Sequence, residues 1–550
     1  MTTKSVSIKP GSRSRLLPAI YPALALAIAA ALLPSALRPP PEQTSDSAAL
    51  NPNAPPDDQS EQVIQAFQQA SGGGAGASLT EAPPTTLPVR GEPPSGKCFG
   101  KPARQTESVY AAPCAPAFKG NNGGATAKNV FANEVRFGFW HVIGAPAQGK
   151  IQETPPPNES GSTRTFRVLQ AYFNKRFETY GRKIQFYGLA GSTDPAADQA
   201  EAKKASEQYQ LFGAYHLNLA FCEPFARDTG PVFCNPQKAE VYQRIRPGFF
   251  SFMIDRTTAA GYGAEFACKK LVGKPAKFSG TETNKLRKIS VVTEQSHDSG
   301  NVAPAVYEQA LQHECGATYT GRSFQLESNN DPDGASAAVA QMRTSGVTTI
   351  VLEGGLVNAL YLMTAAEGVG WQPEWVIVNA FGLDFNLIGT ILPANQARHL
   401  FGLSAWEVPR RFEETECYQA YKEIDPDNDP DGSVCQLFWH PMVLMLDGVQ
   451  EAGPRLTPQT FQDGLFKMGH RFPEEPWAIG GGFGPDDYSY MDNVGEVWFN
   501  LNAVNPENSA PGAYVWSYGA RRFKRGELPP DDGQLFHHGV TTPGGPEYNQ

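Results

Sequence analysis

The chain has 550 residues, of which 54 are glycine and 47 are proline, and its formal net charge is −10. The Gly and Pro content is above average but far below that of collagen, and the 40% of apolar residues is enough for a packed core. This length allows two to four domains. Because the chain is acidic and has no long Lys/Arg tract, general nucleic-acid binding is excluded as its function.

Residues 1–37 have the pattern of an export signal or a membrane anchor. Basic residues up to Arg15 precede the uncharged run 16–37, which is long enough to span a bilayer but contains three prolines. We therefore expect either a cleaved signal peptide or a retained anchor, with the membrane as a partner in the second case. Both alternatives place the protein in the periplasm or at the cell surface.

Two segments are predicted to lie outside the packed core. Residues 38–125 are rich in Pro and Gly and read as a linker, because such a stretch buries too little apolar surface to offset the entropy of ordering it. Residues 526–550 read as a flexible tail. Together these segments account for much of the Gly and Pro content, which leaves about 400 residues for folded lobes.

The eight cysteines favour an exported protein. Their number is even and no C-x-x-C motif occurs, so up to four disulfides are expected outside the cytosol. Pairing between sequence neighbours is the simplest scheme, although spacing alone leaves the connectivity open. The four pairs in this scheme are Cys98–Cys114, Cys222–Cys234, Cys268–Cys315 and Cys417–Cys435.

From residue 133 onward, apolar runs alternate with amphipathic stretches. Strands are expected at residues 134–142, 183–189, 211–215, 232–233, 288–293, 348–352 and 375–378. Helices are expected at residues 165–180, 194–208, 261–271, 302–313, 333–344 and 356–367. This alternation predicts βαβ units with parallel sheets, and the number of units favours two doubly wound α/β lobes. In such folds ligands bind at the carboxyl ends of the strands.

A search for catalytic residues finds no constellation above background. Ser296, His297 and Asp298 have the residue types of a hydrolytic triad, but neighbours on one loop cannot point at each other as a triad requires. Neither a G-x-S-x-G elbow nor an H-E-x-x-H motif occurs. We therefore predict that the protein is not an enzyme and needs no cofactor, with calcium as one exception to test.

That exception is a short acidic loop. Asp427, Asp429 and Asp431, followed by Gly432, fit the first half of a calcium loop, D-x-D-x-D-G. The twelfth position, which supplies a bidentate acid in such loops, is Phe438. The loop is therefore either a weak Ca²⁺ site or an Asp/Pro/Gly turn.

Several short motifs stand in an order that resembles a known family. They are Gly181-Arg182-Lys183-Ile184, Asp194-Pro195, Gly230 to Phe233, Lys288 to Thr293 followed by Asp298-Ser299-Gly300, and Gly370-Trp371. Over residues 133–520 the chain is similar to the type I periplasmic solute-binding proteins, the branched-chain amino-acid (leucine/isoleucine/valine) receptor-like family of ABC transporters. Each motif is weak alone, and their order is the specific signal.

The resemblance implies two Rossmann-like lobes with parallel central sheets, joined by a three-strand hinge. It places residues 126–255 and 384–480 in the first lobe and residues 256–383 and 481–525 in the second. A ligand would close the lobes on each other.

The resemblance also implies which loops face the ligand. In the first lobe these loops supply His141, Tyr215, His216, Asn218, Asn235 and Gln237. In the second lobe they supply Ser296, Ser299, Gly355, Leu356, Phe381 and Asp384. Phe381 stands near the position where amino-acid receptors have an acid for the ammonium group. The aromatic and amide side chains therefore favour a larger, neutral or weakly polar solute.

These patterns favour an extracytoplasmic solute-binding protein that closes on a small organic solute for uptake through an ABC permease or for sensing. Two alternatives stay open. One is a cell-surface interaction or assembly module that has the same fold and a degenerate ligand site. The other is a secreted α/β hydrolase.

Overall fold

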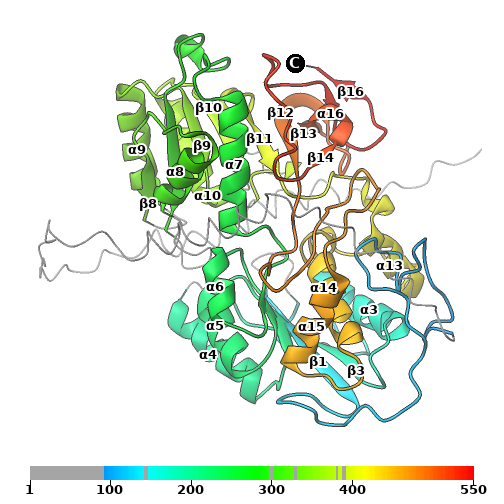
Figure 1. Cartoon of the computed structure of the whole chain (residues 1–550). Helices are drawn as coiled ribbons and strands as arrows, with labels where there is room; N and C mark the ends of the chain where they lie inside the picture. The colour runs from blue at the N-terminus through cyan, green and yellow to red at the C-terminus, as the bar shows by residue number, and fades with distance from the viewer. Residues whose placement is uncertain are drawn as a thin grey trace, which may run out of the picture. The chain divides into compact units, whose positions relative to one another are not determined.

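The computed structural model describes residues 92–140, 146–191, 194–295, 303–327, 331–378, 382–386 and 392–549. Its strands form two sheets (Figure 1). The first has the order β2-β3-β1-β4-β5-β6, and the second has the order β16-β15-β13-β12-β11-β10-β9-β7-β8 with β14 paired to β12. We call each sheet with its covering helices a lobe. The predicted α/β architecture with two sheets built on parallel strands is confirmed, and the second sheet adds antiparallel strands to its parallel ones.

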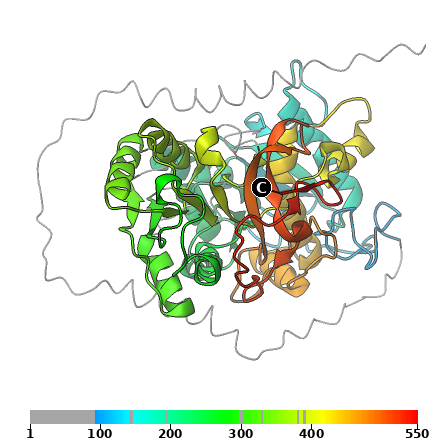
Figure 2. The same ribbon diagram turned by 90° about the horizontal axis from the view of Figure 1, so that it is seen from above.

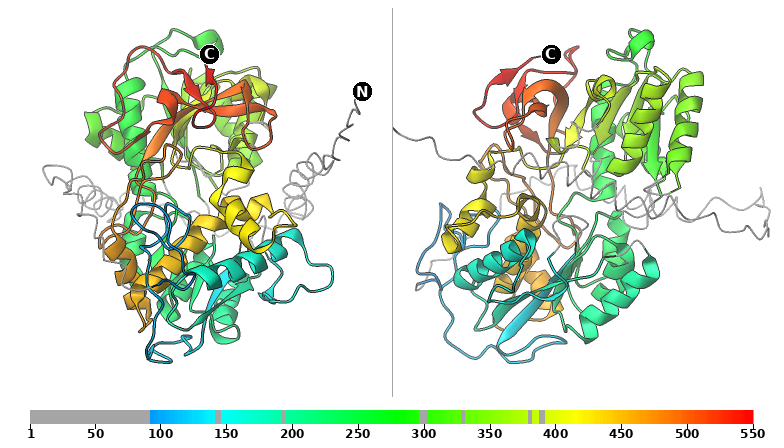
Figure 3. Two further views of the ribbon diagram at one scale, coloured as in Figure 1. Left: turned by 90° about the vertical axis from the view of Figure 1, so that its right-hand side faces the viewer. Right: turned by 180° about the vertical axis from the view of Figure 1, so that it is seen from behind.

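The first sheet is parallel except for β2, which pairs antiparallel with β3. Its strands are β1 (Glu134–Phe139), β2 (Gly149–Lys150), β3 (Lys183–Gly188), β4 (Gly213–Tyr215), β5 (Val232–Phe233) and β6 (Phe249–Phe250). Its helices are α3 (Gly161–Arg176), α4 (Pro195–Glu207), α5 (Leu219–Asp228), α6 (Ala239–Arg244), α13 (Glu416–Ile424), α14 (Gly432–Ala452) and α15 (Pro458–Met468). Helices cover both faces, with α4 beside α5 and with α3 beside α13 and α14 (Figure 3).

The second sheet has a parallel half and an antiparallel half. The parallel strands are β7 (Ile289–Glu294), β8 (Phe324–Leu326), β9 (Thr349–Leu352), β10 (Glu374–Val378) and β11 (Leu400–Ser404). The antiparallel strands are β12 (Val494–Val504), β13 (Pro511–Trp516), β14 (Arg522–Phe523), β15 (Gly539–Val540) and β16 (Glu547–Tyr548). Seen from above, the C-terminal strands, drawn in orange and red, lie beside the parallel strands (Figure 2).

The helices of this lobe also cover both faces of the parallel strands, since α7 packs on α8 and α9 packs on α10. They are α7 (Arg256–Lys270), α8 (Pro304–Cys315), α9 (Pro332–Thr344), α10 (Leu356–Gly368), α12 (Ala394–Ala397) and α16 (Ser517–Ala520). Two 3₁₀ turns, η1 (Gly280–Glu282) and η2 (Phe412–Glu414), complete the described elements.

Capping residues explain where the predicted helices shift. The helix expected at residues 165–180 begins earlier because the Ser160 hydroxyl accepts a hydrogen bond from Thr163 N at 3.1 Å. It also ends earlier, at Arg176, because Phe177 is in the extended conformation with φ −78° and ψ 145°. Asp194 caps α4 as predicted, whereas the helix expected at 261–271 starts at Arg256 because Asp255 caps it.

Three connections join the lobes. The first runs from β6 to α7, the second from β11 to α13, and the third from α15 to β12. β11 pairs with β10, so the predicted boundary at residue 384 comes too early, and the chain returns to the first lobe only after Ser404. Ser251 on the first connection pairs with Ser489 on the third.

The predicted linker is wrong for its last part, residues 92–125. The run Val109 to Ala112 is buried, and its backbone is held by two acids of the first lobe. Val109 N donates to Glu416 Oε1 at 2.8 Å and Ala112 N donates to Asp447 Oδ1 at 2.6 Å. This segment, which we call the strap (residues 104–114), is therefore part of the folded core.

The predicted flexible tail, residues 526–550, is also wrong for its described part. β15 and β16 extend the second sheet, and Phe536 is buried. Its ring stacks on Trp498 with centroids 5.2 Å apart and on Phe278 at 4.1 Å. Burial of this aromatic ring anchors the tail to the second lobe.

All four disulfides of the neighbour scheme are present: Cys98–Cys114, Cys222–Cys234, Cys268–Cys315 and Cys417–Cys435. No helix in the described ranges is long and apolar enough to cross a bilayer. The predicted signal or anchor, residues 1–37, lies outside those ranges.

Candidate ligand-binding site

The first lobe brings the predicted polar residues to the carboxyl ends of β4 and β5. Tyr215 is the last residue of β4, and His216 and Asn218 follow it. Asn235 and Gln237 follow β5 in the same way. The two strands are parallel neighbours, so their ends lie at one edge of the sheet, and all five side chains are buried.

His216 is the centre of an aromatic stack at this edge. Its ring lies between Trp140, at a centroid distance of 4.4 Å, and Phe221, at 4.1 Å. His216 Nδ1 accepts a hydrogen bond from Asn218 N at 3.0 Å, so the neutral ring carries its proton on Nε2. The stack and this hydrogen bond fix the orientation of the imidazole.

The amide residues at this edge are bonded within the protein. Asn218 Nδ2 donates to Asp198 Oδ2 on α4 at 2.6 Å. Gln237 Nε2 donates to the Asn235 carbonyl at 3.2 Å, and the Gln237 carbonyl accepts from Arg256 N at 3.0 Å. Gln237 therefore joins this edge to the first turn of α7 in the second lobe.

The second lobe presents buried acids at the matching edge, and the sequence interpretation missed them. Glu294 ends β7, and Glu353 follows β9 directly. Both side chains are buried. The available signal was a charged residue at the carboxyl end of an apolar strand, where parallel sheets bind ligands.

Burial raises the pKa of Glu294 to about 7, and repulsion by Glu353 adds to this. Asn358 Nδ2 donates to Glu294 Oε2 at 2.9 Å, and this hydrogen bond opposes the shift. Glu353 forms a buried ion pair with Arg256, yet burial still raises its pKa. Near pH 7 both the protonated and the ionised form of Glu294 are therefore present. The first can donate a hydrogen bond and the second can accept one.

Gly354 and Gly355 leave room for the Glu294 carboxylate. A Cβ at Gly354 would lie 3.1 Å from Glu294 Oε2, and one at Gly355 would lie 3.2 Å from Oε1. The backbone N–H of Gly355 also bonds to this carboxylate. The predicted residue Gly355 thus lies at the edge of the sheet, as a backbone contact of an acid that was not predicted. Leu356, the other residue predicted on this loop, begins α10, but its side chain lies outside the described part of the structure.

Asp384 lies beyond β10 and is buried. It accepts a hydrogen bond from Ser404 Oγ, at the end of β11, at 2.6 Å. Burial raises its pKa to about 7. Its second oxygen, Oδ1, is buried and has no hydrogen-bond partner among the described residues.

The other predicted site residues, His141, Ser296, Ser299 and Phe381, lie outside the described ranges, as does His297 of the triad-like run. The structure therefore brings together Tyr215, His216, Asn218, Asn235 and Gln237 at one edge, and places Gly355 at the edge of the other sheet. A role of these residues in solute binding stays a prediction.

The acidic loop proposed for calcium uses its carboxylates separately. Asp429 Oδ1 pairs with Lys422 Nζ at 2.8 Å, and Asp431 caps α14 by accepting from Ser433 N at 3.0 Å. Among the described residues, Asp427 forms no hydrogen bond or ion pair with either of them. Calcium binding gains no support from these contacts and stays a prediction.

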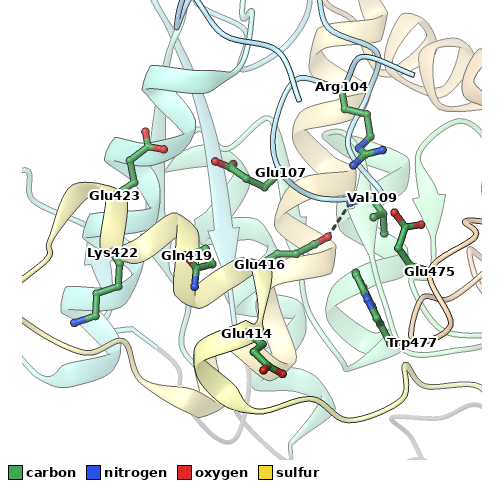
Figure 4. Close-up of a pocket in the computed structure, with 10 residues that line it drawn as sticks. All are labelled: Arg104, Glu107, Val109, Glu414, Glu416, Gln419, Lys422, Glu423, Glu475 and Trp477. Carbon is green, nitrogen blue, oxygen red and sulfur yellow. Dashed lines mark hydrogen bonds between the residues drawn. The ribbon is translucent and has the colours of Figure 1, made fainter. Parts of the chain in front are cut away.

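A pocket of about 600 Å³ lies elsewhere on the first lobe (Figure 4). It is formed by the strap, the η2–α13 region and the third connection, and contains no predicted ligand residue. Its lining is Arg104, Glu107, Val109, Glu414, Glu416, Gln419, Lys422, Glu423, Glu475 and Trp477. Arg176 pairs with both Glu107 and Glu423, so part of the acidic charge of the pocket lining is already neutralised within the protein.

Comparisons with known proteins agree with this fold. No protein-family model matches the chain, and no curated protein sequence does either. A fatty acid ABC transporter substrate-binding protein from Thermomonospora curvata has a similar structure, with 15% identity, a TM-score of 0.51, and coverage of 77% of this chain and 100% of that one.

Two other solved structures are similar over comparable lengths. A solute-binding protein from R. palustris in complex with 4-hydroxybenzoate shares 11% identity, with a TM-score of 0.49 and coverage of 72% and 98%. A possible leucine/isoleucine/valine-binding protein from Rhodopirellula baltica shares 12%, with a TM-score of 0.46 and coverage of 70% and 96%.

The chain therefore has the fold of the type I periplasmic solute-binding proteins, as the sequence resemblance predicted. At these identities the similarity defines the fold, and the ligand has to be argued from the residues of this chain.

Proposed function

We propose that this protein is an extracytoplasmic solute-binding protein that closes its two lobes on a small organic solute, for ABC-type uptake or for sensing. The observation that carries the proposal is the pair of sheet edges: aromatic and amide groups follow β4 and β5, and buried acids follow β7 and β9. Each edge is a place where parallel sheets bind ligands. No covalent step is needed, since burial of the solute supplies the affinity.

The favoured solute is neutral or weakly polar and carries a ring or an amide. The stack of Trp140, His216 and Phe221 gives the first edge a rigid aromatic support. At the second edge Glu294, with a pKa of about 7, can donate to a carbonyl or accept from an N–H. The similar protein from Thermomonospora curvata is a fatty acid ABC transporter substrate-binding protein, so fatty acids belong in the test set.

One observation favours the second candidate, an interaction or assembly module whose ligand site is degenerate. The cavity at the ends of β7 and β9 is only about 10 Å³, about the space of one water. The protein's own Glu294 and Asn358 are among the residues that line it. A module of this kind would keep the fold and bind no solute.

The two candidates are separated by a ligand screen on the full chain. Thermal shift with amino acids, peptides, amides, aromatic acids and fatty acids is combined with small-angle scattering. Solute binding predicts at least one compound that raises Tm and makes the protein more compact. If no compound does either, the solute-binding proposal is wrong and the interaction module is favoured.

A variant tests the location of the site. Glu294→Gln keeps the size of the side chain but removes its charge, so it should reduce the Tm shift given by the best ligand. Glu282→Gln changes an acid paired with Lys285 on the surface of the same lobe and should leave the shift unchanged. Equal ligand shifts in both variants would place the solute away from β7.

A further inference from the structure

The third connection between the lobes, residues 469–493, folds back on itself. Arg471 pairs with Gly481, Gly481 pairs with Met491, and a tight turn pairs Gly484 with Asp487. These pairings bring His470, at the start of the connection, next to acids at its end. They lie outside the candidate ligand-binding site.

Three possible ligand atoms meet there. His470 Nε2 lies 3.0 Å from Asp487 Oδ2 and 3.3 Å from Asp492 Oδ2. All three atoms are within 4.8 Å of one another, and within the described ranges no other group of three or more His, Cys, Asp or Glu side chains comes this close. The side chains are 38%, 30% and 18% exposed, so the group is partly accessible to solvent.

Among the described residues, His470 is the one basic side chain that pairs with the acids of this group. Neither Asp487 nor Asp492 pairs with a lysine or arginine of the described residues. A third acid, Asp255, is linked to them through Ser489 Oγ, which lies 3.3 Å from Asp487 Oδ1 and 3.4 Å from Asp255 Oδ2. Asp255 thus adds a third carboxylate beside the two that face His470.

The environment of Asp492 would favour a bound cation. The ligand oxygens of Asp487 and Asp492 lie within 4.8 Å of each other, so two like charges repel each other here. Apart from its contact with His470, the buried atom Oδ2 of Asp492 accepts no hydrogen bond among the described residues. A cation bound between the three side chains would satisfy this oxygen and offset the repulsion.

We propose that His470 Nε2, Asp487 Oδ2 and Asp492 Oδ2 form a site for a first-row divalent metal ion such as Zn²⁺. Around tetrahedral zinc with bonds of about 2.0–2.1 Å, neighbouring ligand atoms lie about 3.4 Å apart. The observed separations of 3.0 and 3.3 Å from Nε2 are close to this value. The imidazole nitrogen favours zinc, nickel or cobalt over calcium and magnesium, which prefer oxygen ligands. A water molecule would occupy the fourth coordination position of the ion.

Neighbouring groups hold one of the ligands in place. Asp487 Oδ1 accepts hydrogen bonds from Ser489 N at 3.1 Å and from Ser489 Oγ at 3.3 Å. The other oxygen, Oδ2, is left to face His470. Such outer contacts fix the orientation of a metal ligand and raise affinity.

Titration calorimetry of the full chain without an affinity tag, after dialysis against EDTA, tests the site with ZnCl₂. We expect one ion per chain, and we expect His470→Ala to weaken the affinity at least tenfold. His538→Ala is the matched control, because within the described ranges His538 Nδ1 pairs with a single acid, Glu547, at 3.4 Å. This variant should bind zinc as the unmodified chain does.

Asp487→Asn gives an independent variant in case His470→Ala does not fold, which circular dichroism would show. Visible absorption of the Co²⁺-loaded chain gives a second readout. The d–d bands of the bound Co²⁺ should be lost in Asp487→Asn. No zinc binding by the unmodified chain, or equal affinity in the His470 and His538 variants, would overturn the proposal.

Discussion

Arg256 and Glu353 form a buried ion pair between the first residue of α7 and the residue that follows β9. The backbone N–H of the same arginine donates to the Gln237 carbonyl of the first lobe at 3.0 Å. One residue thus contacts the candidate edges of both lobes. The pair also sets the charge near Glu294, whose pKa Arg256 lowers and Glu353 raises.

Removal of Glu353 should strongly destabilise the protein. Glu353→Ala leaves the Arg256 guanidinium buried without its counter-ion, and breaking a buried pair in this way costs about 3–5 kcal/mol. Urea unfolding measures the change. Glu282→Ala, which breaks an exposed pair with Lys285, should cost less than about 1 kcal/mol. Similar costs for both variants would contradict the burial of the first pair.

The raised pKa of Glu294 predicts that stability falls as pH rises. Its pKa is about 7 in the folded protein against 4.5 as the ordinary value, so the folded state binds more protons between these values. The free energy of unfolding therefore decreases from about pH 4.5 to 7 and levels off above, by about 3 kcal/mol at most from this group.

Glu294→Gln isolates this contribution. The difference in unfolding free energy between the unmodified chain and the variant should change steadily between pH 5 and 7.5, in favour of the variant at high pH. Asp384, whose pKa is also about 7, is present in both proteins and cancels in the difference. A difference that is constant with pH would show that Glu294 titrates normally.

The strand ends of the first lobe could be predicted because local patterns determine them. β4 and β5 are short apolar runs, and the polar residues Asn218 and Asn235 follow them within a few positions. The acids of the second lobe could not be predicted in the same way. Whether Glu353 is buried depends on Arg256, which lies 97 residues earlier in the chain.

The strap is a second part of the structure that could not be predicted, because it depends on distant residues. Its Pro- and Gly-rich surroundings predict a linker, and the apolar run Val109 to Ala112 is too short to form a core alone. Its partners, Glu416 and Asp447, lie 307 and 335 residues further on. Composition describes only the neighbouring residues, so it cannot show that distant acids will order this backbone.

The strap should contribute to the stability of the whole first lobe. Tyr110 is buried, its hydroxyl accepts from Ile479 N at 3.0 Å, and its ring lies edge-on to His440 at 4.6 Å. Tyr110→Ala removes a buried aromatic ring and should cost about 3–5 kcal/mol. Tyr110→Phe removes only the acceptor of Ile479 N and should cost about 1–3 kcal/mol.

Urea unfolding followed by tryptophan fluorescence compares the two variants with the unmodified chain. If Tyr110→Ala were as stable as the unmodified chain, the strap would be a passive cover and the linker interpretation would hold for its residues after all.

The disulfides should contribute differently to the free energy of unfolding, according to the lengths of the loops that they close. Cys268–Cys315 joins α7 to α8 across 47 residues, whereas Cys222–Cys234 spans 12. Loop-closure entropy in the unfolded chain then predicts about 4 kcal/mol for the first and about 3 kcal/mol for the second. Replacing each pair by alanine and measuring urea unfolding under oxidising conditions tests the order. Cys222 and Cys234 are buried, whereas Cys268 is partly buried and Cys315 is exposed, so the alanine variant of Cys222–Cys234 also loses more packing. A larger loss for Cys222–Cys234 would show that packing at the end of β5, next to Asn235, outweighs the constraint on the unfolded chain.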